Sequence, residues 1–131
     1  MTERLASCSC GQLTARTTTD PLRVSVCHCR TCQRRTGSVF GAQARFHRDA
    51  VTITGTSTRW ERTADSGRRL AFHFCPVCGA TVHYGFEDMP EFVGIPVGAF
   101  GDPAFPPPVF SVYEDAMHPW VGLPAGIRHS R

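Results

Sequence analysis

Seven cysteines, gathered in three short clusters, constrain the fold of this 131-residue chain more than any other feature. The clusters span residues 8–10, 27–32 and 75–78, and no cysteine lies outside them. A disulfide within such short spacings is strained, because the usual separation of the two Cα atoms is hard to reach. An odd number of cysteines is also a poor disulfide framework. The clusters therefore favour thiolate ligands for a soft metal ion, and Zn²⁺ accepts sulfur at tetrahedral positions.

The residues that follow the clusters divide the seven thiols into two groups. Cys10 is followed by Gly11 and Cys78 by Gly79, and glycine can turn the chain back under a metal through a positive φ angle without steric cost. These two pairs predict a closed, structural zinc site that ties the amino-terminal segment to a later hairpin. Metal-free cysteines are the alternative for this group, which comprises Cys8, Cys10, Cys75 and Cys78.

The remaining thiols, Cys27, Cys29 and Cys32, are one ligand short of a closed site. Three protein ligands leave the fourth position of zinc open, and catalytic zinc sites keep such a position for water or substrate. Two alternatives stay open: a second structural site completed by a histidine, and a redox-active thiol cluster without metal. The histidines available by composition are His28, His73, His83 and His118.

Three thiolates give a bound Zn²⁺ a net negative formal charge, which makes it a weaker Lewis acid towards water than a site with neutral ligands. Hydrolysis is therefore disfavoured, whereas an incoming thiol would be held as a thiolate at neutral pH, ready to meet or release an electrophile. The predicted chemistry is the making or breaking of a carbon–sulfur bond. Side chains beside the three cysteines are candidate contacts for a carboxylate-bearing thiol, with plain solvent exposure as the alternative: Arg30, Arg34, Arg35 and Ser38.

Length and composition predict one globular domain over residues 1–131. The chain is 41% hydrophobic and 19% charged, unlike a disordered protein. It shows neither an apolar run of membrane-helix length nor a signal peptide, so we expect a cytoplasmic protein that does not engage a membrane. The net charge of +3 comes with arginines scattered along the chain. This distribution does not form the continuous basic stripe of a nucleic-acid binder.

Short strand patterns separated by glycine and proline predict an all-β fold of small sheets pinned by the four-cysteine site, similar to a zinc ribbon. Residues 30–36 have the composition of a short helix or turn, ended by Gly37. Strands are expected over residues 13–19, 23–26, 38–46, 51–54, 56–62, 69–74, 80–86, 92–100 and 109–113.

Three expectations concern how these segments are arranged. Residues 51–54 and 56–62 should pair as a hairpin around Gly55. Pro96 should place the strand over residues 92–100 at a sheet edge or in a bulge, because proline cannot donate to a neighbouring strand. The segment of residues 120–124, with its tryptophan, should fold back on the core.

The ordered cysteine motifs resemble those of the glutathione-dependent formaldehyde-activating enzyme (GFA) family, which also includes centromere protein V. The matching segments are residues 8–11, 27–32, 36–38, 74–79 and 98–103, together with Trp120. The resemblance implies an all-β fold with a structural four-cysteine zinc and a second zinc on the cysteines of residues 27–32. It implies a carbon–sulfur lyase that reversibly combines glutathione with formaldehyde to give S-hydroxymethylglutathione, with basic groups orienting the glutathione carboxylates. The centromere relatives suggest the alternative, a zinc-stabilised binding module without catalysis.

Overall fold

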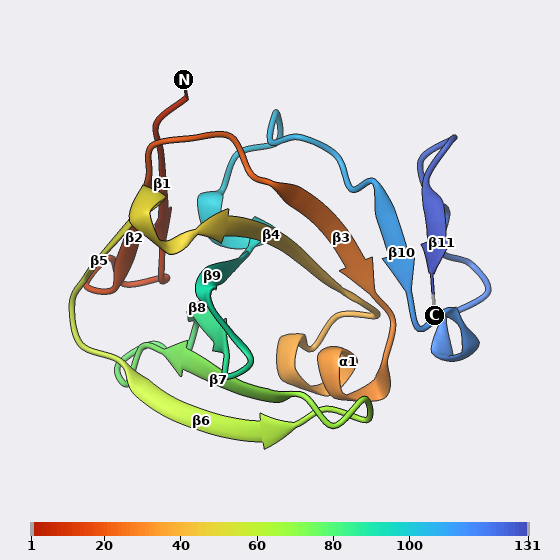
Figure 1. Ribbon diagram of the computed structural model, residues 1–131, viewed down its shortest axis with the longest axis horizontal. Helices are drawn as coiled ribbons and strands as arrows, with labels where there is room; N and C mark the ends of the chain where they lie inside the picture. Colours follow the sequence, from red (N-terminus) through yellow and green to blue (C-terminus); the bar gives the residue numbers. More distant parts are fainter. Residues whose placement is uncertain (1, 131) are drawn as a thin grey trace.

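The computed structural model describes residues 2–130, which are built mainly from β-strands (Figure 1). Within these residues, eleven strands form two sheets. The smaller sheet is antiparallel, with the order β1–β2–β5, and contains β1 (Arg4–Ser7), β2 (Thr14–Thr17) and β5 (Val51–Thr54). The larger sheet has the order β11–β10–β3–β4–β9–β8–β7–β6 and contains β3 (Arg23–Cys27), β4 (Gly41–His47), β6 (Thr58–Thr63), β7 (Arg69–Phe74), β8 (Thr81–Phe86), β9 (Met89–Pro96), β10 (Phe110–Val112) and β11 (Arg128–Ser130).

The helical elements are short. The one α-helix in the described part of the chain is α1 (Arg30–Thr36), and the 3₁₀ turns are η1 (Arg48–Ala50), η2 (Val97–Phe100) and η3 (Glu114–Ala116). None of these helices has the length and hydropathy needed to cross a membrane. The predicted all-β fold class is therefore confirmed, and α1 ends as expected at Gly37, which has a φ of 72°.

The larger sheet is strongly bent, so that β6 and β7 face back towards β3 and β4 (Figure 1). Its strands pair antiparallel except at β10, which runs parallel to both β3 and β11. The helix α1 follows directly after β3 and lies at the open side of the bend (Figure 1). The bend thus brings side chains from strands far apart in the sequence around one space.

The buried core lies where the smaller sheet packs on the larger one. Ala6 and Ala15 come from the smaller sheet, and they share a buried cluster with Ala44 and Phe46 of β4. Because side chains alternate along a strand, the burial of Ala44 and Phe46 turns the residue between them, Arg45, towards the opposite face of the larger sheet. That opposite face carries the candidate site.

The predicted hairpin between residues 51–54 and 56–62 is wrong. The strand β5 pairs with β2 of the smaller sheet, whereas β6 pairs with β7 of the larger one. The chain changes sheets at Gly55, which has a φ of 107° and passes so close to Gln12 that a Cβ would lie 2.0 Å from the Gln12 carbonyl oxygen. The Gln12 side chain donates to the Thr56 carbonyl at 2.7 Å and accepts from the Thr56 amide at 2.9 Å. These bonds to another segment replace those of a hairpin turn.

Two further expectations are corrected. The strand predicted over residues 92–100 runs instead from Met89 to Pro96, and the 3₁₀ turn η2 follows. The strand β9 lies between β4 and β8 rather than at an edge, and Pro96 is its last residue. Trp120 does not fold back on the core: it is 73% exposed, and its ring contacts His118. The short strands β1 and β11 were not predicted.

Candidate metal centres and an arginine-lined cavity

The structure brings the first group of cysteines together in space. The sulfur atoms of the four residues all lie within 4.8 Å of one another, and the Cys8–Cys10 and Cys10–Cys75 sulfur pairs are each 3.6 Å apart. Four sulfurs about 2.3 Å from a zinc ion stand about 3.8 Å apart in a regular tetrahedron. The arrangement therefore fits a tetrahedral ion held by Cys8, Cys10, Cys75 and Cys78.

Hydrogen-bond donors surround these sulfurs. The Leu13 amide donates to the Cys8 sulfur at 3.3 Å, and the Cys75 sulfur accepts from the Val77 amide at 3.3 Å and from the Gln12 side chain at 3.0 Å. Burial raises the pKa of Cys75, but hydrogen bonds from the Cys78 amide, the Gln12 side chain and the Val77 amide outweigh it and lower that pKa to about 6. A thiolate, the form that binds zinc, is thus favoured at Cys75.

This group lies between the two sheets. Cys8 and Cys10 lie in the turn between β1 and β2, while Cys75 and Cys78 lie in the turn between β7 and β8. The following glycines, Gly11 and Gly79, have φ angles of 90° and 82°, as expected for knuckle turns. None of the four cysteines lines the cavity described below. The group can hold the sheets together, but a substrate in that cavity does not reach it.

The second group forms where β3 meets α1. Cys27 is the last residue of β3, Cys29 caps the helix, and Cys32 lies in its first turn, where its amide donates to the Cys29 sulfur at 3.3 Å. The three sulfurs lie within 4.8 Å of one another. A hydrogen bond from the Cys27 thiol, helped by Cys29 and Arg35, lowers the pKa of Cys32 to about 6. The same bond, together with burial, raises the pKa of Cys27.

Within the described residues, no histidine joins either group of cysteines. His28 points elsewhere and pairs with the Ser111 hydroxyl at 2.9 Å, and His118 pairs with Gln33. His73 and His83 stack on each other across β7 and β8, with ring centroids 4.4 Å apart. The closed site completed by a histidine therefore has no candidate ligand in place.

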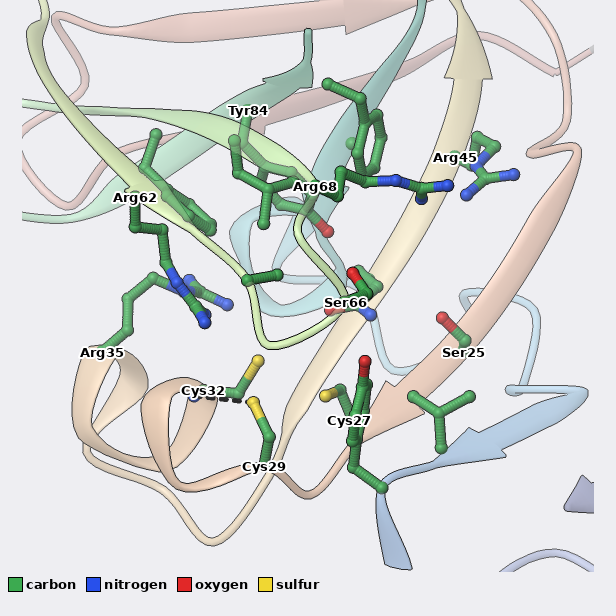
Figure 2. A pocket seen from close by; sticks show the side chains of 18 of the residues that line it. Ser25, Cys27, Cys29, Cys32, Arg35, Arg45, Arg62, Ser66, Arg68 and Tyr84 are labelled. Carbon is green, nitrogen blue, oxygen red and sulfur yellow. Dashed lines mark hydrogen bonds between the residues drawn. The ribbon is translucent and has the colours of Figure 1, made fainter. Parts of the chain in front are cut away.

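All three cysteines of the second group line a cavity of about 340 Å³ inside the bend of the larger sheet. The cavity collects five arginines from β3, β4, α1, β6 and the β6–β7 loop, whereas Asp65 is its one lining carboxylate. Figure 2 shows Arg35 and Arg62 on the side of Cys32, with Arg68 and Arg45 further along the cavity. Of the five, only Arg68 forms an ion pair in the described part of the chain, with Asp88 at 3.3 Å. The five are Arg23, Arg35, Arg45, Arg62 and Arg68.

Two of these arginines face each other across paired strands. Arg23 of β3 stands opposite Arg45 of β4, and like charges in this position destabilise a sheet. Aromatic faces hold both in place: Arg23 lies 4.3 Å from the Phe110 ring centroid and Arg45 lies 5.4 Å from that of Phe86. Burial, reinforced by Arg23 and Arg68, lowers the pKa of Arg45. An anion between the two guanidinium groups would relieve their repulsion.

Only one of the four substrate contacts predicted from the sequence lines the cavity. Arg35 lines the cavity, where its guanidinium lies 4.8 Å from the Phe72 ring centroid. Arg30, Arg34 and Ser38 are exposed and do not line it.

Sequence reasoning missed four of the cavity arginines. Alternation along β3 could have found Arg23, because Arg23, Ser25 and Cys27 share a face. Arg62 and Arg68 flank the loop between β6 and β7, and finding them required the strand pairing that the sequence analysis assigned wrongly.

The fold and the two cysteine groups define an all-β protein with two candidate zinc centres, one of them beside a cationic cavity. Residues 3–116 match the family described as glutathione-dependent formaldehyde-activating enzyme, and the chain belongs to this family. A crystal structure of a Rhodobacter sphaeroides protein has a similar fold, with a TM-score of 0.57 and 20% identity over 72% of this chain and 85% of that chain. No curated protein matches the sequence significantly. The family predicted from the cysteine motifs is thereby confirmed.

Proposed function

We propose that this protein is a zinc-dependent carbon–sulfur lyase that joins a small thiol to a small aldehyde and catalyses the reverse reaction. Glutathione and formaldehyde, the reactants in the family's description, are the first candidates. The observation that carries the proposal is that Cys27, Cys29 and Cys32 line a cationic cavity whereas the four-cysteine group does not. A thiol substrate bound in this cavity would therefore lie beside one group of cysteines only.

We assign a structural zinc to the group of four cysteines and a second zinc to the group of three. When bound at the second group, zinc would supply a Lewis acid that keeps a substrate thiol deprotonated at neutral pH. Cys27, Cys29 and Cys32 would hold it at one end of the cavity.

The arginines would bind the carboxylates of the substrate, away from its thiol. Carboxylates bind guanidinium groups through paired, charge-assisted hydrogen bonds, and Arg23 and Arg45 offer two such groups without a protein carboxylate between them. Arg35 offers another beside the cysteines. We assign the carboxylate contacts to these residues rather than to the exposed Arg30, Arg34 and Ser38, which would meet only parts of a substrate outside the cavity. A volume of about 340 Å³ is within the usual range for small-molecule sites.

In the forward direction, the substrate sulfur attacks the carbonyl carbon of the aldehyde. A carbon–sulfur bond forms, the π electrons move onto the oxygen, and this oxygen takes up the proton that the thiol gave up. The reverse reaction breaks the same bond. The chain's contribution is to hold the thiol by its carboxylates at a fixed distance from the cysteines and to shield the reacting atoms with apolar walls such as Leu70 and Phe72.

We also propose that residues 1–131 act as one domain in the cytoplasm, where thiols stay reduced. The proposed partner is a small molecule rather than a nucleic acid, because four arginines that form no ion pair in the described part of the chain line a cavity instead of an exposed stripe.

The direct test is exchange spectroscopy by NMR on glutathione and formaldehyde, with a protein-free sample as the reference. Zinc-loaded protein should speed the exchange between glutathione and S-hydroxymethylglutathione, and Cys32→Ser should abolish the acceleration. The diethyl ester of glutathione, which lacks free carboxylates, is the matched control substrate and should be a poor one. No acceleration across a panel of thiols and small aldehydes would refute the enzyme and favour the zinc-stabilised binding module.

A further inference from the structure

The cavity contains a buried hydroxyl group that bonds to nothing in the described structure. Tyr84 of β8 is 5% exposed and lines the cavity, and its hydroxyl oxygen is almost fully buried and has no hydrogen-bond partner in the described structure. Buried hydroxyls are nearly always paired, and an unpaired one costs stability. Figure 2 shows the Tyr84 side chain reaching from β8 into the space whose other end holds the three cysteines. A molecule that enters the cavity could therefore supply the hydrogen-bond partner that the Tyr84 hydroxyl lacks.

The ring of Tyr84 packs over a glycine, which has no side chain to occupy that space. Gly94 of β9 is its cross-strand partner, and a Cβ on Gly94 would lie 2.1 Å from the Cε2 atom of the ring. On the other side, the ring of Phe72 lies 5.1 Å away between centroids. A residue with any side chain at position 94 would force the tyrosine out. The phenol is thus fixed in one direction, as a positioned functional group requires.

Charged groups of the site also act on this hydroxyl. Burial raises the pKa of Tyr84, and the charges of Arg35, Cys32 and Arg45 also act on it. The hydroxyl therefore keeps its proton and serves as a neutral donor in the cavity that the cysteines and the arginines also line. It complements the arginines, because a neutral donor does not compete for carboxylates as strongly as a guanidinium does.

We propose that Tyr84 is a catalytic residue whose hydroxyl donates a hydrogen bond to the aldehyde oxygen while the carbon–sulfur bond forms. This inference rests on the proposed function. As the substrate sulfur adds to the carbonyl carbon, the π pair moves onto the oxygen, and the Tyr84 hydroxyl stabilises the developing negative charge there. Tyr84 keeps its own proton, and the oxygen takes up the one released by the thiol. In the reverse direction, the same hydrogen bond stabilises the negative charge on the oxygen while the carbon–sulfur bond breaks.

Tyr84→Phe tests this role, because it removes only the hydroxyl oxygen and leaves the ring packed against Phe72 and Gly94. We expect kcat for the glutathione and formaldehyde reaction to fall about 100-fold, the usual loss for one such donor, with little change in the KM for the thiol. The thermal midpoint should stay the same or rise, because an unpaired buried hydroxyl is lost. If Tyr84 has only a structural role, kcat should instead be unchanged in this variant.

A second measurement does not depend on turnover. Isothermal titration should show that the wild-type protein binds S-(2-hydroxyethyl)glutathione about fivefold more tightly than S-ethylglutathione, as one net hydrogen bond predicts, and that Tyr84→Phe binds both equally. Tyr113→Phe is the matched control: it removes the other phenol lining the cavity, from a residue that is only half-buried, and should lose less activity than Tyr84→Phe.

The outcomes separate the two proposals. An active wild-type protein with an equally active Tyr84→Phe variant overturns the role of Tyr84 alone. A larger loss in Tyr113→Phe than in Tyr84→Phe does the same. A wild-type protein that accelerates no thiol and aldehyde pair removes the proposed function and this inference with it.

Discussion

Replacing one cysteine in each group should separate a centre that holds the fold from a centre that reacts. Cys78→Ser and Cys32→Ser each remove one sulfur and keep a side chain of nearly the same size. Cys78 is exposed, so the substitution leaves no cavity in the core, and any large loss of stability reports the loss of metal. Cys32 is half-buried at the start of α1, away from the contact between the sheets.

The expected difference is large. A structural zinc contributes on the order of 10 kcal/mol to folding, and a chain of 131 residues has a total stability of about 7–20 kcal/mol. Losing the four-cysteine centre would therefore remove half of the stability or more. Cys32→Ser loses an open site whose ligands all come from one short segment, and the cost should be about 1–2 kcal/mol. At roughly 3 °C per kcal/mol, this is a shift of about 5 °C, against unfolding or a drop of about 20 °C or more for Cys78→Ser.

Circular dichroism melts of the zinc-loaded proteins, with zinc content measured by mass spectrometry, give both quantities. Cys32→Ser should retain about one zinc per chain where the wild type holds about two. Cys32→Ser should lose turnover and keep its fold. An equal fall in the thermal midpoint for both variants would refute the division of the seven cysteines into a structural and a reactive group.

Three further predictions use other parts of the structure. Arg45→Met should raise the KM for glutathione about tenfold, leave cysteamine unaffected and raise the thermal midpoint by relieving the repulsion from Arg23; equal effects on both thiols would contradict a carboxylate contact. Burial and, to a lesser extent, the charge of the stacked His73 lower the pKa of His83 to about 4. The contribution of neutral His83 to stability should therefore be fully present above about pH 6.5. About 2 kcal/mol, allowing for partial exposure, should be lost as the pH falls to 4, and His83→Phe should flatten this part of the curve of unfolding free energy against pH. Gly55→Ala should cost at least about 2 kcal/mol in urea unfolding, because its Cβ would meet the Gln12 carbonyl and its φ is positive; a neutral result would show that this crossing between the sheets can relax.

Several predictions that rest on neighbouring residues in the sequence agree with the structure. The cysteine spacings and the glycines after them anticipated two groups of sulfurs and the turns beneath one of them. The alternation in residues 23–26 anticipated β3, and Gly37 anticipated the end of α1. In each case the signal lies within a few residues of the feature, because backbone conformation and ligand spacing are local properties.

Features that depend on contacts between distant segments were not predictable in the same way. The strands on either side of Gly55 look like a hairpin in sequence, but the bonds that separate them come from Gln12, far earlier in the chain. The arginines of the cavity are scattered in sequence and meet only because the larger sheet bends (Figure 1). Tyr84 is one aromatic residue among several in its strand, and its unpaired hydroxyl is visible only once the neighbours are in place.

The two groups of cysteines differ in how many segments supply the sulfurs, and this difference explains why one should react and the other should not. Two turns on different sheets supply four sulfurs, enough to fill all the positions of a tetrahedral zinc and leave none for a substrate. Sulfurs from one segment, at the end of β3 and the start of α1, approach from one side only. The other side of the metal then faces whatever lies across from that segment, and here this is the arginine-lined cavity. Topology, more than ligand chemistry, would thus select the reactive centre, since both groups offer the same thiolates.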